Sequence, residues 1–104
     1  MSITVMKNYI NGEWVDSSTD TFGDIWNPVL GEKIASVPYG NSQDVDLAVK
    51  AAAEAYPEWR ETPPLSRARL LFRLKEAFEE EFEDIARVLT TEQGKAIDES
   101  RGEV

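Results

Sequence analysis

The apolar residues of this 104-residue chain change their spacing near residue 41. Before that point, short apolar stretches alternate with turn residues. After it, apolar side chains recur every three or four positions, as Val45, Val49 and Ala52 do. A period of two is typical of strands and a period of 3.6 is typical of helices. The pattern therefore predicts strands and hairpins over residues 1–40 and a helical part over residues 41–104.

Two turns punctuate the strand part. Asn11-Gly12 is the favoured pair for a type I′ hairpin, because both central residues of that turn have positive φ. This turn would place Tyr9 opposite Trp14 as a cross-strand aromatic pair. Residues 16–21, DSSTDT, form a polar loop. A second pair of strands is expected around the turn Asn27–Gly31, where proline fixes φ and glycine can adopt the left-handed conformation.

The helical part contains several start and stop signals. Asn41 or Ser42 can cap the first helix, and Pro57 is expected to end or kink it, which makes residues 58–65 a connector. Ser66 is the predicted cap of the next helix. A break is expected near Glu80–Phe82.

The end of the chain gives two further signals. Gly94 is a plausible C-cap glycine. Residues from Lys95 onward read as a helix still in progress at Val104, with no terminator after it.

Composition narrows the possible functions. The formal net charge is −9, which disfavours binding to nucleic acid or anionic membranes. The chain contains neither cysteine nor histidine, so it offers no thiol nucleophile, no imidazole base and no common zinc ligand. No apolar run approaches the ~18 residues of a membrane span, and the N-terminus lacks the pattern of a secretory signal. These features predict a cytoplasmic protein.

Four groups of residues could carry chemistry, and each has a simpler structural interpretation. The acidic residues are expected to form a solvated helix face, and the glycines lack the spacings of a phosphate-binding loop. The arginines are expected to pair with nearby glutamates. The tryptophans are expected to cover the edges of a core. The groups are Glu79, Glu80, Glu81, Glu83 and Asp84; Gly12, Gly23, Gly31, Gly40, Gly94 and Gly102; Arg60, Arg67, Arg69 and Arg73; and Trp14, Trp26 and Trp59. From the residues alone we predict an α+β segment with no catalytic, cofactor-binding or metal-binding residue.

Four stretches, taken in order, resemble the N-terminal part of aldehyde dehydrogenases. They are YINGEWV, NPVLGEKIASVP, DVDLAVKAAAEAYPEWRETPPLSRARLLFRLKE and LTTEQGKAIDESRGEV. WRETPPLSRARLLFRLKE and EQGKAIDESRGEV look most like the methylmalonate-semialdehyde group, which acylates coenzyme A. The EQGK and RGEV portion is also similar to succinate-semialdehyde dehydrogenases.

The resemblance implies an α/β fold in which residues 1–104 are the N-terminal fragment of a cofactor-binding domain, with hairpins followed by three or four helices. For the complete protein it implies a homo-oligomeric oxidoreductase. A cysteine thiolate would attack a small aldehyde, hydride would pass to NAD or NADP, and water or coenzyme A would release the thioester. The family's cysteine, glutamate, asparagine and glycine motif lie beyond the matched region. The chain alone is therefore expected to be inactive, without bound cofactor.

One minor role could transfer from the family. Some members hold a monovalent cation through backbone carbonyls and an acidic side chain, and the matching positions here are Ile25, Trp26 and Glu92. A different class of function also remains open, because the chain could be a non-catalytic, stand-alone interaction module.

Overall fold

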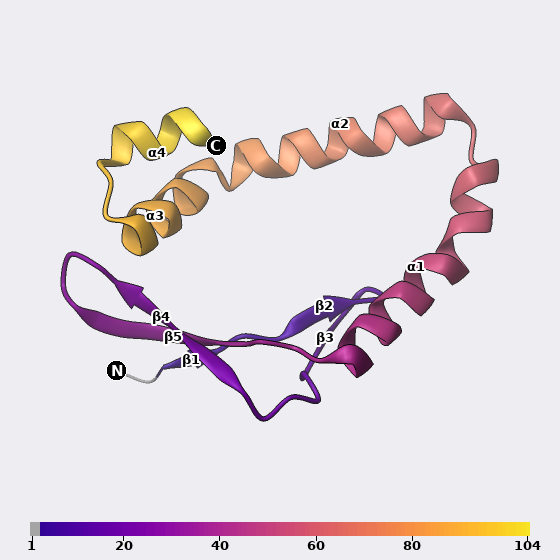
Figure 1. The fold of residues 1–104 in the computed structure, drawn as a ribbon. Coiled ribbons are helices and arrows are strands. Elements are labelled where there is room, and N and C mark those ends of the chain that lie inside the picture. The colour runs from indigo at the N-terminus through magenta and orange to yellow at the C-terminus, as the bar shows by residue number, and fades with distance from the viewer. Residues whose placement is uncertain (1–2) are drawn as a thin grey trace. The chain divides into compact units, whose positions relative to one another are not determined.

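The computed structural model describes residues 3–104, which contain five strands and four helices (Figure 1). The elements are β1 (Thr4–Val5), β2 (Asn8–Ile10), β3 (Glu13–Val15), β4 (Phe22–Asn27), β5 (Glu32–Pro38), α1 (Ser42–Glu61), α2 (Pro64–Glu80), α3 (Phe82–Gln93) and α4 (Ile97–Glu103). The chain divides into two compact units. The strand unit comprises the residues up to Trp26 together with Lys33–Glu61, and the helical unit comprises Asn27–Glu32 together with Thr62–Val104.

Strands β2 and β3 form the predicted hairpin. Asn11 and Gly12 have φ values of 54° and 78°, so both central residues of the turn are left-handed and the type I′ prediction is confirmed. Tyr9 pairs directly with Trp14 across the antiparallel ladder, and their ring centroids lie 4.9 Å apart. The two-residue turn thus sets the register of a hairpin that has only three residues in each strand, and the aromatic pair adds a cross-strand contact in that register.

The second sheet has the strand order β1-β5-β4. β1 runs parallel to β5, with Thr4 opposite Ala35, and the ladder ends with a 2.8 Å hydrogen bond from Met6 N to Ser36 O. The predicted turn between β4 and β5 is confirmed. Gly31 has φ 68° and donates from its N–H to Asn27 O at 2.8 Å. Here a polar side chain assists the turn, because Asn27 Oδ1 accepts the N–H groups of the next two turn residues, Val29 and Leu30, at 3.0 and 3.1 Å.

Helix α1 starts as predicted but ends later than expected. Of the two possible caps, Asn41 is the one that acts, since its Oδ1 accepts the N–H of Asp44 at 3.0 Å. The expectation that Pro57 could end the helix is wrong, because α1 continues to Glu61. Proline removes one helical N–H, and here the helix persists on both sides of that gap. The predicted connector over residues 58–65 therefore shrinks to residues 62–63.

The prediction that Ser66 caps α2 is also wrong. The helix begins at Pro64, Pro63 occupies the N-cap position, and no side chain caps the first turn. Proline at the first helical position has φ already set for the helix and lacks an N–H that would otherwise need a partner. This preference moves the start two residues ahead of Ser66. The break expected near residues 80–82 is confirmed, with Glu81 between α2 and α3.

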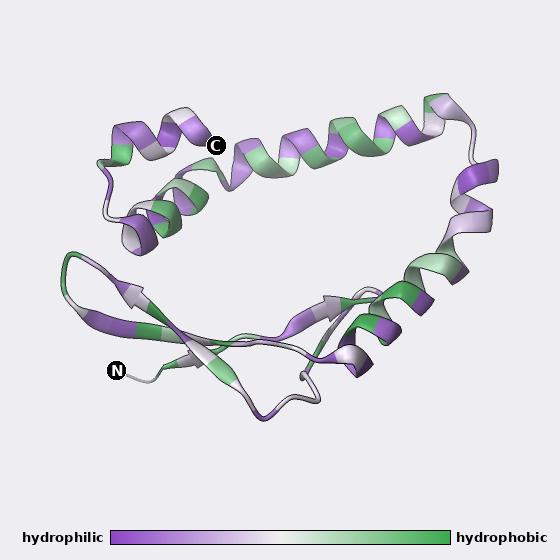
Figure 2. Cartoon of the chain, viewed as in Figure 1, coloured by the Kyte–Doolittle hydropathy of each residue, from purple (hydrophilic) through white to green (hydrophobic). Residues whose placement is uncertain are grey.

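Figure 2 shows apolar residues along α1, α2 and α3. Many apolar side chains of these helices lie exposed. On α2 the stripe Leu70, Leu71, Leu74 and Phe78 is 43–60% exposed. Ala35 in the strand unit and Ala86 in the helical unit are the buried apolar residues among residues 3–104. Neither unit therefore builds a substantial apolar core from its own side chains. In that same range, no helix has both the length and the apolar character that crossing a bilayer requires.

Candidate functional site

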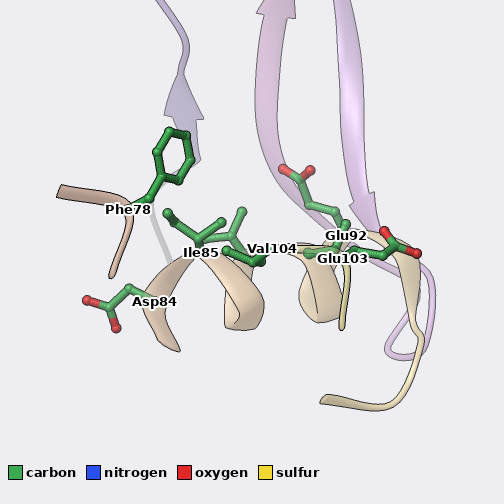
Figure 3. A pocket seen from close by; sticks show the side chains of 8 residues that line it. Phe78, Asp84, Ile85, Glu92, Glu103 and Val104 are labelled. Atoms are coloured by element: carbon green, nitrogen blue, oxygen red, sulfur yellow. The ribbon is translucent and has the colours of Figure 1, made fainter. Parts of the chain in front are cut away.

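An open apolar groove lies in the helical unit where α2, α3 and α4 approach one another. Phe78 comes from the end of α2, Ile85, Val88 and Leu89 from α3, and Val104 follows α4. The groove has a volume of about 570 Å³. Its rim carries three carboxylates, with Asp84 at one end and Glu92 and Glu103 at the other (Figure 3).

The corner between α3 and α4 shapes this groove. Gly94 ends α3 in the left-handed conformation, with φ 77°, and its N–H donates to Thr90 O at 2.8 Å, which confirms its predicted capping role. The last helix begins at Ile97, two residues later than predicted, with Ala96 as its N-cap. The chain therefore reverses within a short connection, and α4 packs against α3.

Small residues allow the two helices to lie close together. Ser100 on α4 and Ala86 on α3 are fully buried. The Ser100 hydroxyl lies 2.7 Å from the Thr90 hydroxyl, so its buried polar group has a hydrogen-bond partner. A buried hydroxyl with a partner avoids the desolvation penalty that an unpaired one would suffer.

Charged pairs fasten the outer side of the same corner. Arg101 donates to both carboxylate oxygens of Glu83 and also to Asp98 Oδ1, and Lys95 pairs with Glu103. Hydrogen bonding by the Arg101 guanidinium lowers the pKa of Glu83 below its ordinary value. The pKa of Arg101 is raised, chiefly by its hydrogen bond to Glu83, so the pair stays ionised over the neutral range.

The groove can bury apolar surface, and it offers neither a thiol nor an imidazole for catalysis. Its floor is hydrocarbon, and the chain has no cysteine or histidine to serve as nucleophile or imidazole base. Within residues 3–104, no group of three or more carboxylates is arranged to hold a metal ion. Nor do the residues fit a dinucleotide, since a rim of carboxylates opposes phosphate and no glycine-rich phosphate loop is present. No step of a reaction is therefore assigned to these side chains.

The structure disperses the acidic group. It spans the end of α2, the break and the start of α3. Glu79 pairs with Lys75 at 2.5 Å, and Glu83 pairs with Arg101. Members of the group thus pair with different basic side chains.

The arginines are divided between the two units, and each tryptophan is partly exposed. Arg60 belongs to α1, whereas the other three arginines belong to α2 in the other unit. Arg60 pairs with the adjacent Glu61 at 3.1 Å and lies over the Tyr56 ring, 5.9 Å from its centroid. Trp14, Trp26 and Trp59 are 65%, 50% and 41% exposed, so within this chain their rings cover core edges only in part.

The cation site implied by resemblance stays a prediction. Ile25 and Trp26 lie in β4 of the strand unit, and Glu92 lies near the end of α3 in the helical unit.

Two polar arrangements escaped prediction from the sequence. One is the Thr90–Ser100 hydroxyl pair, whose two members belong to α3 and α4. The other surrounds Asp44, a buried carboxylate bonded to the DSSTDT loop. A polar loop that precedes an acidic first helical turn is a possible signal for the second arrangement, although spacing alone does not reveal which residues meet.

Comparison with known proteins identifies the chain. The family described as "Aldehyde dehydrogenase family" matches residues 14–104. The chain belongs to the aldehyde dehydrogenase family. It is 41% identical over 103 residues to malonate-semialdehyde dehydrogenase of Lacticaseibacillus casei, an alignment that covers 99% of this chain and 21% of that protein.

Solved structures of aldehyde dehydrogenases share the same fold. A protein of Sinorhizobium meliloti, assigned as methylmalonate-semialdehyde dehydrogenase and crystallised with NAD, superposes with a TM-score of 0.95 at 28% identity, covering 99% of this chain and 21% of that one. The methylmalonate-semialdehyde dehydrogenase of Oceanimonas doudoroffii gives 0.92 at 36% identity, covering 97% and 20%. The aldehyde dehydrogenase segment described here therefore has the α/β fold of the N-terminal region of these enzymes and spans about a fifth of their length.

Proposed function

We propose that this chain is the N-terminal part of the cofactor-binding domain of an NAD(P)-dependent dehydrogenase that oxidises a semialdehyde. The observation that carries this proposal is the combination of a family match over residues 14–104 with a backbone that superposes at a TM-score of 0.95 on a fifth of an NAD-bound relative. The names of the relatives, malonate- and methylmalonate-semialdehyde dehydrogenase, support a short acidic aldehyde as substrate.

In this proposal the chain contributes structure and does not take part in the chemistry. The apolar groove and the exposed stripe of α2 are the surfaces that the remainder of the domain would cover. Their exposure supports the proposal, because side chains such as Phe78 and Leu71, 49% and 60% exposed, gain free energy when another surface removes them from water. The cysteine, the nucleotide-binding loop and the oligomer interface would belong to that remainder, in a cytoplasmic homo-oligomer.

The acceptor of the acyl group distinguishes two versions of the enzyme. The stretch WRETPPLSRARLLFRLKE favours the methylmalonate-semialdehyde group and release to coenzyme A. The EQGK and RGEV portion is also similar to succinate-semialdehyde dehydrogenases, and in this second version water would release the acid.

The first experiment is to read the coding sequence downstream of Val104 and to produce the continuous protein. We expect a reading frame that encodes a glycine-rich loop and a cysteine. We also expect reduction of NAD or NADP with malonate, methylmalonate or succinate semialdehyde, abolished when that cysteine becomes alanine. Comparing the rates across the three semialdehydes identifies the substrate. Mass spectrometry of the product, with and without coenzyme A, separates acyl-CoA from the free acid.

The 104-residue chain is the matched control, and it should neither oxidise aldehyde nor gain thermal stability from NAD or NADP. A stop codon directly after Val104 in an intact, expressed gene would contradict the proposal. It would favour the stand-alone interaction module instead.

A further inference from the structure

A buried carboxylate joins the polar loop of the strand unit to the start of α1. Asp44, in the first turn of the helix, is only 8% exposed. One of its oxygens accepts the hydroxyl of Ser17, and the other accepts the N–H of Ser18 at 3.0 Å and the Ser18 hydroxyl at 3.2 Å. Asn41 adds a further link, because its Oδ1 caps Asp44 N–H and lies 3.0 Å from the Ser18 hydroxyl.

The position of this loop gives the network its structural importance. Residues 16–21 connect β3 to β4, and these two strands belong to different sheets. Contacts that hold residues 16–21 against α1 therefore also hold the connection between the two sheets in place. Among the described residues of the strand unit, Ala35 is the buried apolar side chain, so little apolar packing is available for this task.

We propose that Asp44 is an acid-sensitive latch that holds the loop 16–21 against the N-terminus of α1 and so fixes the two sheets of the strand unit relative to each other. The latch needs the carboxylate form, since an ionised carboxylate accepts hydrogen bonds from all three donors at once. Protonation would turn one oxygen into a donor and weaken its bonds to the serines. This proposal does not depend on the chemistry of the complete enzyme.

Acid should open the latch, and neutral pH should keep it closed. The hydroxyl of Ser17, followed by the N–H of Ser18, lowers the pKa of Asp44 below its ordinary value. A lowered pKa means that the contribution of the carboxylate is complete above the pKa of the unfolded chain, about 3.9. It is lost as the pH falls through the folded value.

Other ionisable groups line the grooves beside Asp44 and could confuse a titration. They are Tyr9, Glu13, Asp16, Tyr39, Lys50 and Glu54. Three of these have their own ionic partners, because Asp16 pairs with Lys7 at 3.6 Å and Lys50 pairs with Glu54 at 3.9 Å. A test must therefore follow Asp44 itself and the loop it holds.

The test compares Asp44→Asn with Asp46→Asn by NMR of the 104-residue chain, at a concentration at which sedimentation shows the chain to be monomeric. Both variants lose one negative charge in the first turns of α1, but Asp46 is exposed. We expect Asp44→Asn to lower the protection of the Ser18 amide against hydrogen exchange by about tenfold or more, and Asp46→Asn to leave it unchanged. In the unsubstituted chain, the Ser18 amide shift should titrate together with the Asp44 carboxyl carbon.

Equal protection of Ser18 in the unsubstituted chain and Asp44→Asn would overturn the proposal, as would a Ser18 shift that follows a different titration midpoint. If Asp44→Asn does not fold, Ser18→Ala provides the second test. It removes two hydroxyl contacts and keeps the charge, so the Asp44 carboxyl should titrate at higher pH than in the unsubstituted chain. An unchanged midpoint in that variant would also contradict the latch.

Discussion

Arg101 donates two hydrogen bonds to Glu83, from Nε to Oε1 at 2.8 Å and from Nη2 to Oε2 at 3.0 Å. The two residues are 18 positions apart in the chain. The pair joins α4 to α3 on the outer side of a corner whose inner side is formed by Ala86 and Ser100. A planar guanidinium fixes the relative orientation of its partner better than an ammonium does. The stability of the α3–α4 corner should therefore depend on Arg101.

The first prediction concerns that arginine. Arg101→Gln should lower the melting temperature of the chain at pH 7, while Arg69→Gln, an exposed arginine on α2, should leave it nearly unchanged. Because the pKa of Glu83 is lowered by Arg101, the contribution of the pair is present above about pH 4.3 and disappears as the pH falls through the folded value. The difference between the Arg101→Gln and unsubstituted chains should therefore shrink in acid. A constant difference from pH 7 to below the folded pKa would contradict the ion pair.

The second prediction compares two glycines of the helical unit. Gly94 has φ 77°, and a Cβ there would lie 3.2 Å from side-chain atoms of both Pro28 and Val29. Gly94→Ala should therefore destabilise the chain by about 1–2 kcal/mol from the left-handed conformation alone, and crowding adds to this. Gly102 is helical with open space around its Cβ position, so Gly102→Ala should stabilise by up to about 1 kcal/mol. Urea unfolding of both variants measures the contrast, and effects of the same sign would refute it.

A third prediction separates a buried serine from an exposed one. Ser100→Ala removes the partner of the Thr90 hydroxyl at a fully buried position and should destabilise by about 1 kcal/mol. Ser66→Ala should change stability by less than about 0.5 kcal/mol, because Ser66 is exposed and does not cap α2. The same unfolding experiment measures both. A loss near 1 kcal/mol for Ser66→Ala would mean that the helix starts at Ser66 after all.

The local elements could be predicted from the sequence because short-range chemistry determines them. Asn and Gly adopt positive φ more readily than other residues, so Asn11-Gly12 favours a type I′ turn. Gly94 ends a helix because glycine adopts the left-handed conformation without steric cost. Two of the helix boundaries that differ from prediction involve proline, which a helix can accommodate at some positions. Pro57 lies inside α1, and Pro64 begins α2 at a position where a missing N–H has no consequence.

The long-range contacts could not be predicted in the same way. β1 has two residues and pairs in parallel with a strand some thirty positions later, which periodicity cannot indicate. Asp44 and Ser17 are separated by 27 positions, and Thr90 and Ser100 lie on different helices. These partners meet only because the folded backbone brings distant residues together, so the sequence pattern does not reveal them. The family resemblance could be found from the sequence because it rests on the order of whole stretches.

The last prediction follows from the exposed stripe on α2. Leu71 and Phe78 remain 60% and 49% exposed, and removing such side chains from water yields roughly 1.5–3 kcal/mol each. We therefore expect the isolated 104-residue chain to have marginal stability and to self-associate in sedimentation experiments as its concentration rises. Phe78→Ser should weaken association, whereas Glu80→Ser, an exposed position on the same helix, should not. A chain that stays monomeric at all concentrations and melts cooperatively would show that these side chains need no further surface to cover them.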